Sequence, residues 1–465
     1  MKNQKSKIKN YILACIICLI TCASSFGNVA VVSGTWERNM KVNQIRLYQM
    51  IDGALTEIAS STLNADNMFF FAVNPQPEGF YFIGVNPQPA NRYTIYLKSG
   101  DRLDLTITED SYLLNGDNSK ENVELKKCHE FMTPVEQQAV YFLKANLPSF
   151  RDYFSVLEQK ATEFAKMPPS RTGNRTFDRK FDAYKKIDFP FQAVASLFIP
   201  RSAHPTANEY PKYFHDLNHV DFVQTTELLD YPNSLQMIER IPFIKVMITG
   251  APSINPVQMI LENMETYIPN DTVKGEMTLK FATSRRTFAG LLDYQELYGK
   301  YFITEKQKNQ FLDILNALNE VKSGAPAFNF TFNDMNDKPV SLTDFKGKVV
   351  YIDVWATWCG PCIQELPHLQ KLKEEYKDNP DVVFMAVSVD AQRDHPKWKK
   401  FIADNNMTGV QLFAGDKANR ELQAPYKITG IPRFMLVGKD GTLVDIDAPR
   451  PSSPEIRPVL KRLLN

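Results

Sequence analysis

Cysteine is scarce in this chain, with six residues in 465. Half of them lie within the first 22 residues, and the others are Cys128, Cys359 and Cys362. Small exported domains that use disulfides in place of a hydrophobic core contain far more cysteine. The sequence therefore excludes a disulfide-stapled scaffold, and its length is sufficient for roughly two to four domains with ordinary cores.

An excess of charge of either sign is also lacking. The 54 basic and 53 acidic residues leave a formal net charge of +1. Proteins that bind nucleic acid or anionic membranes electrostatically carry a basic excess. We therefore expect no nucleic-acid partner, and other partners have to be inferred from the chemistry of individual residues.

The chain has one long apolar run, at residues 11–20. The ten residues before it contain four lysines and no acid, and small residues follow it at 23–25. This order is typical of a signal peptide, and the run is shorter than the roughly 20 residues of a membrane span. We predict a signal peptide at residues 1–25 and export of the mature chain to the periplasm or cell envelope.

Cys22 leaves an alternative open for the N-terminus. The three residues before it, Leu19, Ile20 and Thr21, resemble a lipoprotein box, although threonine is unusual directly before the cysteine. In this alternative the mature protein is a membrane-anchored lipoprotein, with a lipid anchor at Cys22.

Residues 26–112 show short segments of alternating apolar and polar residues separated by turn residues. This pattern predicts strands rather than helices, and we expect an antiparallel β-sandwich. It resembles the small β-domains that precede thioredoxin-like domains in exported proteins. The predicted strands cover residues 44–50, 67–73, 79–85, 93–97 and 102–108.

Residues 113–322 show apolar residues at helical spacing, as in Phe150, Tyr153, Phe154 and Leu157. Prolines recur through this region, Pro190 and Pro242 among them, and are expected to end helices. We predict an α-helical bundle of moderately long helices.

Two constellations in this region suggest chemistry. His215 and His219 have the spacing of a zinc-protease helix, but no third ligand is identifiable, so no metal site is predicted. Cys128 precedes His129, which leaves two interpretations: a thiol activated by its neighbour, or a buried and inert cysteine. The second interpretation is the commoner situation for a free cysteine.

Residues 323–465 contain strands alternating with helices, which predicts an α/β domain with a mixed central sheet flanked by helices. An apolar, β-branched run at 349–354 is followed by Cys359, and Gly360-Pro361 then ends the extended segment. Cys359 is thus expected at the N-terminus of a helix, where unpaired N–H groups and the helix dipole favour a thiolate. Cys362 lies one turn further on, close enough for a disulfide.

Three interpretations compete for this Cys-x-x-Cys pair. A zinc site needs two further ligands, and this region contains no other cysteine and only His368 and His395. A structural disulfide does not require the surrounding Trp358, Gly360 and Pro361. A redox-active dithiol is therefore favoured.

The residues Trp358-Cys359-Gly360-Pro361-Cys362, together with Pro367 and the pair Ile431-Pro432, resemble the thioredoxin superfamily. Glu365, three residues after the second cysteine, is similar to the motif of TlpA/ResA-like exported thiol-disulfide oxidoreductases. The resemblance implies a thioredoxin-like fold, a cis-proline at Pro432 and no cofactor besides the redox-active disulfide. The substrate-binding residues that it implies are Trp358, Gly360, Pro361, Ile431, Pro432 and Arg433.

The expected mechanism uses Cys359 as nucleophile and Cys362 as the resolving thiol. Cys359 is expected nearer to solvent, and Cys362 then needs a base. Asp353 matches the buried aspartate of thioredoxins, and Glu365 lies at i+3 from Cys362, so we expect the two carboxylates to share this proton. The alternatives are a capped polar residue in the sheet for Asp353 and a solvated helix carboxylate for Glu365.

Arg433 is interpreted either as a group that stabilises the thiolate or selects acidic substrates, or as a plain surface arginine. His368, Lys371 and Lys373 are expected on a solvated helix face.

The Gly-Pro dipeptide between the cysteines and the isoleucine before Pro432 resemble reducing members of the superfamily. We therefore expect an enzyme that reduces disulfides of exported proteins and depends on a membrane electron donor. A disulfide isomerase or oxidase is the alternative, as is a protein that uses the domain only to bind partners.

Overall fold

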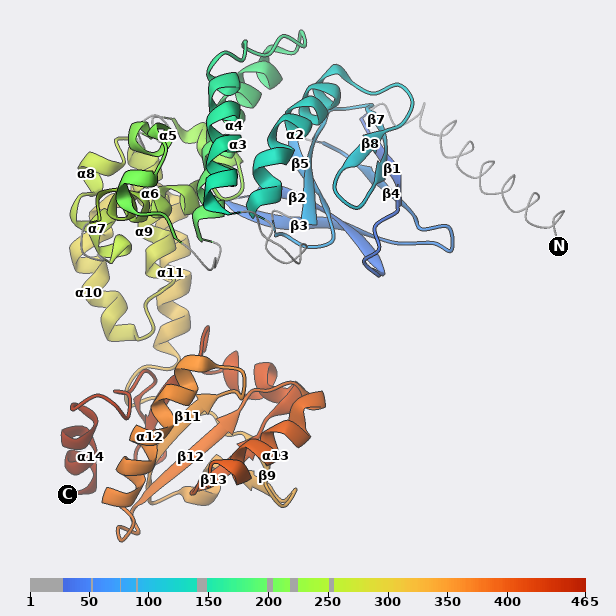
Figure 1. Cartoon of the computed structure of the whole chain (residues 1–465). Helices are drawn as coiled ribbons and strands as arrows, with labels where there is room; N and C mark the ends of the chain where they lie inside the picture. Colours follow the sequence, from blue (N-terminus) through green and yellow to red (C-terminus); the bar gives the residue numbers. More distant parts are fainter. Residues whose placement is uncertain are drawn as a thin grey trace, which may run out of the picture. The chain divides into compact units, whose positions relative to one another are not determined.

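The computed structural model describes residues 28–51, 53–75, 77–88, 91–139, 149–198, 204–217, 225–250 and 255–465 (Figure 1). The predicted signal peptide and Cys22 lie outside these ranges. The chain divides into two compact units between Lys274 and Gly275. In the described part of the chain, no helix combines the length and apolarity that a membrane span requires. The three predicted domain bounds stay predictions.

The first unit begins with eight strands in two four-stranded sheets, ordered β4-β1-β7-β8 and β3-β2-β5-β6. All five predicted strands are present, and the sequence analysis missed three others. The strands are β1 Ala30–Trp36, β2 Gln44–Ile51, β3 Ala54–Thr62, β4 Met68–Val73, β5 Gly79–Gly84, β6 Arg92–Leu97, β7 Arg102–Ile107 and β8 Tyr112–Leu114.

The two sheets contribute to one hydrophobic cluster, which contains Val32 from the first sheet and Leu47 from the second. In β1 every second residue is buried, as expected for a strand with one face on a core. Every residue of β5 is buried instead. Its Tyr81 belongs to the shared cluster, and the ring of Phe80 on the other face lies 5.8 Å from that of Phe177 in helix α4 (Arg175–Ala195).

The prediction of a purely antiparallel domain is wrong at β1, which pairs antiparallel with β4 but parallel with β7. Gly34 makes the close approach to β7 possible, because a Cβ atom there would lie 2.1 Å from the carbonyl oxygen of Leu105. Alternating burial shows which face of a strand is covered, but it carries no information about the direction of the partner strand.

Helices follow from residue 120 to residue 319, in agreement with the prediction. Pro190 and Pro242 lie inside helices, so the prediction that they end helices is wrong; both are buried, and packing offsets the lost hydrogen bond. The helices are α2 Lys120–Ala139, α3 Phe150–Ala165, α4 Arg175–Ala195, α5 Lys212–Asp216, α6 Ser234–Thr249, α7 Pro256–Glu262, α8 Met264–Tyr267, α9 Asp271–Ala282, α10 Phe288–Tyr298 and α11 Glu305–Asn319.

The second unit contains a seven-stranded mixed sheet in the order β10-β9-β13-β12-β11-β14-β15. Its strands are β9 Thr331–Asp334, β10 Pro339–Ser341, β11 Val349–Trp355, β12 Val382–Ser388, β13 Val410–Phe413, β14 Arg433–Val437 and β15 Leu443–Asp445. Helices α12 Gly360–Glu375, α13 His395–Asp404 and α14 Ile456–Leu464 accompany it.

Strand β11 is the interior strand that delivers the cysteines. It pairs parallel with β12 and antiparallel with β14, and all seven of its residues are buried. A strand covered on both faces is expected to be a continuous apolar run, which is the pattern of residues 349–355 apart from Asp353. This single carboxyl group in an apolar strand therefore requires a functional explanation.

Candidate active site

Cys359 is the N-cap residue of α12, directly after the turn that follows β11. Its sulfur accepts a hydrogen bond from the backbone N–H of Cys362 at 3.2 Å. The two cysteines form a disulfide, with their Cα atoms 5.2 Å apart. Once the disulfide is reduced, the free N–H groups of the first helical turn favour a thiolate on Cys359.

Exposure distinguishes the two cysteines less than the sequence analysis expects. Cys359 is 5% exposed and Cys362 is 2% exposed, so neither sulfur lies openly in solvent. Trp358 beside them is 62% exposed. The helix terminus, rather than solvent contact, is therefore the main difference between the two thiols.

The Ile431–Pro432 peptide bond is cis, as the resemblance implies, and β14 starts directly after it. Ile431 packs against the apolar cluster that contains Cys359 and Cys362. The cis-proline segment is thereby held next to the disulfide, where its main chain can pair with an extended substrate segment.

Asp353 lies inside β11 with 3% of its surface exposed. Its Oδ1 atom has no hydrogen-bond partner among the described residues. The pKa of Asp353 is raised to about 7 by burial, against the positive charge of Lys373 and with a smaller contribution from the charge of Glu365. A carboxyl group with this pKa and a free oxygen can take or give a proton near neutral pH.

Lys373 departs from the predicted solvated face. It is partly buried, and its Nζ donates a hydrogen bond to the carbonyl oxygen of Thr408 at 2.6 Å. Burial lowers the pKa of Lys373 to about 8, against the effect of Asp353. His368 and Lys371 are exposed as predicted.

Glu365 is buried by the segment that precedes α14. Its carboxylate accepts hydrogen bonds from the backbone N–H of Ser452 at 3.0 Å and from the Ser452 hydroxyl at 2.9 Å. Nη1 of Arg450 lies 3.9 Å from the same carboxylate. The alternative of a solvated helix carboxylate is therefore wrong, because both oxygens hold the segment that precedes α14.

Replacing Glu365 by glutamine is expected to lower the free energy of unfolding by about 1–3 kcal/mol, because the two Ser452 donors lose a charged acceptor that is itself buried. Urea denaturation of the oxidised protein measures this loss. Glu374→Gln on the same helix is the matched control, since Glu374 is 70% exposed, and should change stability by less than about 0.5 kcal/mol. Equal denaturation midpoints for the two variants would show that the Ser452 contacts contribute little.

Arg433 is 1% exposed, so the interpretation as a plain surface arginine is wrong. Its Nη1 atom donates to the carbonyl oxygen of Ile446 at 3.3 Å and lies 3.5 Å from Oδ1 of Asp447. Burial lowers its pKa, and Asp447 opposes this effect. These contacts lie after β15, which supports a role in holding that segment against β14.

Sequence reasoning missed Asp390, which fixes the turn before the cysteines. Its fully buried carboxylate accepts from the backbone N–H of Thr357 at 2.9 Å and from the Thr357 hydroxyl at 2.8 Å. Asp390 follows β12 and Thr357 follows β11, two parallel neighbours whose carboxyl ends meet at one edge of the sheet. The position of Asp390 directly after a predicted buried strand is the sequence signal that could have identified it.

A buried strand that delivers a Cys-x-x-Cys pair to a helix N-terminus, next to a cis-proline, defines a thioredoxin-like dithiol domain. The Redoxin family model matches residues 321–461. The Bacillus subtilis thioredoxin-like protein YneN is 31% identical over 126 residues, which cover 27% of this chain and 71% of that protein. The thiol-disulfide oxidoreductase ResA of Bacillus anthracis is 29% identical over 126 residues, which cover 27% of this chain and 69% of that protein.

Among solved structures, a putative thiol-disulfide oxidoreductase from Bacteroides vulgatus is 40% identical. The alignment covers 31% of this chain and 98% of the Bacteroides chain, with a TM-score of 0.28. Through its C-terminal region the chain belongs to the thioredoxin superfamily, in its TlpA/ResA-like group, and it is a thiol-disulfide oxidoreductase.

Proposed function

We propose that this protein is an exported reductase of protein disulfides. The observation that carries the proposal is the Cys359–Cys362 disulfide at the start of α12, with the buried carboxyl group of Asp353 in the strand that leads to it. A cysteine activated by a helix terminus favours the first attack of a dithiol–disulfide cycle, and a buried acid with a pKa near neutrality can accept the proton of the resolving cysteine.

The cycle starts with the reduced protein. The Cys359 thiolate attacks one sulfur of the substrate disulfide, the substrate S–S bond breaks, and the other substrate sulfur leaves as a thiolate. Cys362 then loses its proton and attacks the sulfur of Cys359, which releases the second substrate thiol. The substrate has gained two electrons, and the Cys359–Cys362 disulfide has formed again.

We assign the role of base for Cys362 to Asp353, and the hydrogen bonds of the two carboxylates support this choice. Its Oδ1 is unpartnered within the described residues, whereas both oxygens of Glu365 accept hydrogen bonds from Ser452. Glu365 then acts on this step mainly through its charge, which raises the pKa of Asp353. The idea that the two carboxylates share the proton is tested by the kinetics of the single and double variants.

Trp358, Gly360, Pro361, Ile431 and Pro432 form the proposed substrate-binding surface. Trp358 is a large apolar side chain that is 62% exposed, so it is suited to pack against a substrate chain. The cis-proline segment supplies main-chain groups beside the disulfide. Protein disulfides, rather than small disulfides, are therefore the proposed substrates.

Export rests on the N-terminal sequence, with its four lysines, apolar run and small residues. We propose a periplasmic or cell-envelope location after cleavage, with a lipid anchor at Cys22 as the alternative. In an oxidising compartment a reductase has to be re-reduced, so a membrane electron donor is the proposed partner.

The reduction potential tests the direction of electron flow. We expect a value near that of thioredoxin, about −270 mV, since Gly360-Pro361 separates the cysteines as in reducing members. Equilibration with dithiothreitol buffers of graded ratio, followed by alkylation of free thiols, gives this potential. A value near −120 mV, as in the oxidant DsbA, would instead support the oxidase or isomerase alternative.

A further inference from the structure

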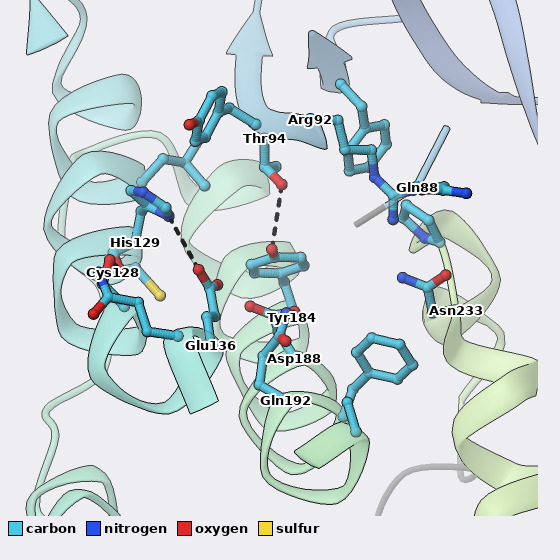
Figure 2. Close-up of a pocket in the computed structure, with 18 of the residues that line it drawn as sticks. Gln88, Arg92, Thr94, Cys128, His129, Glu136, Tyr184, Asp188, Gln192 and Asn233 are labelled. Atoms are coloured by element: carbon cyan, nitrogen blue, oxygen red, sulfur yellow. Dashed lines mark hydrogen bonds and ion pairs between the residues drawn. The ribbon is translucent and has the colours of Figure 1, made fainter. Parts of the chain in front are cut away.

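The first unit contains a cavity of about 520 Å³, which lies within residues 38–240. Its lining comes from β5, β6, β8, α2, α4 and α6 and from segments that connect the elements of this unit (Figure 2). The volume is in the range of about 300–1,000 Å³ that is common for small-molecule sites. The thioredoxin-like site contributes no residue to it.

One wall of the cavity is acidic. Glu136 of α2 and Asp188 of α4 both line it, and Figure 2 shows them on adjacent helices with Tyr184 and Gln192. The nearest ion partner of Glu136 is Nδ1 of His129 at 3.7 Å. Asp188 has no cationic nitrogen within 4.0 Å in the described part of the chain. The cavity thus holds two acids without a cationic partner.

Burial and mutual repulsion disfavour the charged forms of these two acids. Burial raises the pKa of Glu136 and the charge of Asp188 raises it further. Burial likewise raises the pKa of Asp188, against hydrogen bonds from Gln192 and Tyr184 and the charge of Arg92. Burial and the charge of Lys126 together lower the pKa of His129 to about 4, so the imidazole is neutral near pH 7. Burial and Asp188 raise the pKa of the Cys128 thiol, which fits the inert interpretation of that cysteine.

The lining also contains three arginines, Arg38, Arg92 and Arg240, and two further acids, Glu109 and Asp110. The Arg240 guanidinium lies 5.1 Å from the ring centre of Phe191 and 5.0 Å from that of Phe198, and its buried Nη1 has no acceptor among the described residues. Arg38 is only 7% exposed, and its Nε likewise lacks an acceptor in the described ranges. Figure 2 shows Arg92, Gln88 and Asn233 across the cavity from Glu136.

These two sets of groups require opposite charges from a ligand. A buried donor without an acceptor costs about 1–3 kcal/mol, and so does a desolvated acid without a partner. A simple anion would satisfy the arginines and leave the acids unpaired, and a simple cation would do the reverse. Amide side chains such as Gln88, Gln192 and Asn233 supply both donors and acceptors, as recognition of peptide groups requires.

We propose that this cavity binds a small zwitterion of the amino-acid or short-peptide class, with its ammonium group at Glu136 and Asp188 and its carboxylate at the arginine side. The aromatic rings that line the site, Tyr184 and Phe191 among them, cover the apolar part of the ligand. This binding function is separate from disulfide exchange.

Isothermal titration of the full exported chain tests the proposal. The probes are the free proteinogenic L-amino acids and alanine di- and tripeptides, each also in an N-acetylated and a C-amidated form. We expect at least one unblocked probe to bind with a Kd below about 1 mM, and each blocked form to bind at least about tenfold more weakly. Failure of every unblocked probe overturns the proposal, as does equal binding of blocked and unblocked forms.

Variants locate the binding site. Glu136→Gln and Arg240→Gln should each weaken binding of the best probe at least about tenfold. Glu130→Gln is the matched control, because Glu130 lies on the same helix, is 62% exposed and does not line the cavity. Unchanged binding in both cavity variants overturns the assignment. If circular dichroism shows that Glu136→Gln or Arg240→Gln is unfolded, Asp188→Asn is used in place of that variant. The same loss of binding, about tenfold, is expected for Asp188→Asn.

Discussion

Replacing Cys359 by serine is expected to abolish disulfide reduction and to leave the fold intact. The serine hydroxyl has nearly the same size, and it can still accept the hydrogen bond that the N–H of Cys362 donates at the helix N-cap. It cannot form a mixed disulfide, so the first step of the cycle is lost. Insulin reduction with dithiothreitol as donor should fall to the uncatalysed rate, with an unchanged circular dichroism spectrum.

Cys362→Ala is the matched variant, because it keeps the nucleophile and removes only the resolving thiol. It should accumulate covalent complexes with substrates through Cys359, and mass spectrometry of non-reduced samples identifies them. In the reduced wild-type protein, iodoacetamide should modify Cys359 faster than Cys362, since Cys359 is the helix cap. Faster modification of Cys362, or complexes trapped by the Cys359→Ser protein, would reverse the assigned roles.

Asp353→Asn is expected to stabilise the oxidised protein at alkaline pH by up to about 4 kcal/mol. The pKa of Asp353 is about 7 in the folded state, against 3.8 for the free side chain, and each pH unit of difference corresponds to about 1.4 kcal/mol. Between these values the folded protein binds more protons than the unfolded one, so wild-type stability falls as pH rises from about 4 to 7. Asparagine cannot ionise, and the variant lacks this fall.

Urea denaturation at pH 4 and pH 8 measures the effect. The two proteins should differ little near pH 4 and most at pH 8. Asp404→Asn, at a side chain that is 57% exposed, should change the free energy of unfolding by less than about 0.5 kcal/mol. A difference between wild type and Asp353→Asn that stays constant from pH 4 to pH 8 would contradict the raised pKa.

The same substitution should slow the cycle. With Asp353 as the base for Cys362, the Asn variant should lengthen the lifetime of the mixed disulfide by about 10²–10⁴-fold in stopped-flow experiments. The first attack by Cys359 should change little. If Glu365→Gln lengthens this lifetime as much as Asp353→Asn, the two carboxylates share the proton as the sequence analysis expects.

The parts of the site that sequence predicts are those that local chemistry determines. The apolar run before Cys359, the Gly360-Pro361 break and the Ile431-Pro432 pair each act within a few residues, and the structure places all three as expected. The cysteine at the helix cap follows from them directly.

The other features of the site depend on contacts between residues that are distant in the chain. Glu365 and Ser452 are 87 residues apart, and no local pattern indicates that a helix carboxylate is covered by a C-terminal segment. Burial of Arg433 likewise depends on the segment after β15, and that of Lys373 on Thr408. The cavity in the first unit is lined from three strands, three helices and several connecting segments, so its acids and arginines carry no common sequence signature.

The position of β1 has a consequence for the order in which the chain acquires its structure. Thr35 of β1 hydrogen-bonds Thr106 of β7, 71 residues later, and β1 occupies an interior place between β4 and β7. A chain that leaves the ribosome N-terminus first holds one of the earliest strands with an unpaired edge until residue 107 has been made. Because unpaired strand edges recruit other chains, we expect chains truncated before β7 to aggregate more readily than chains that include it.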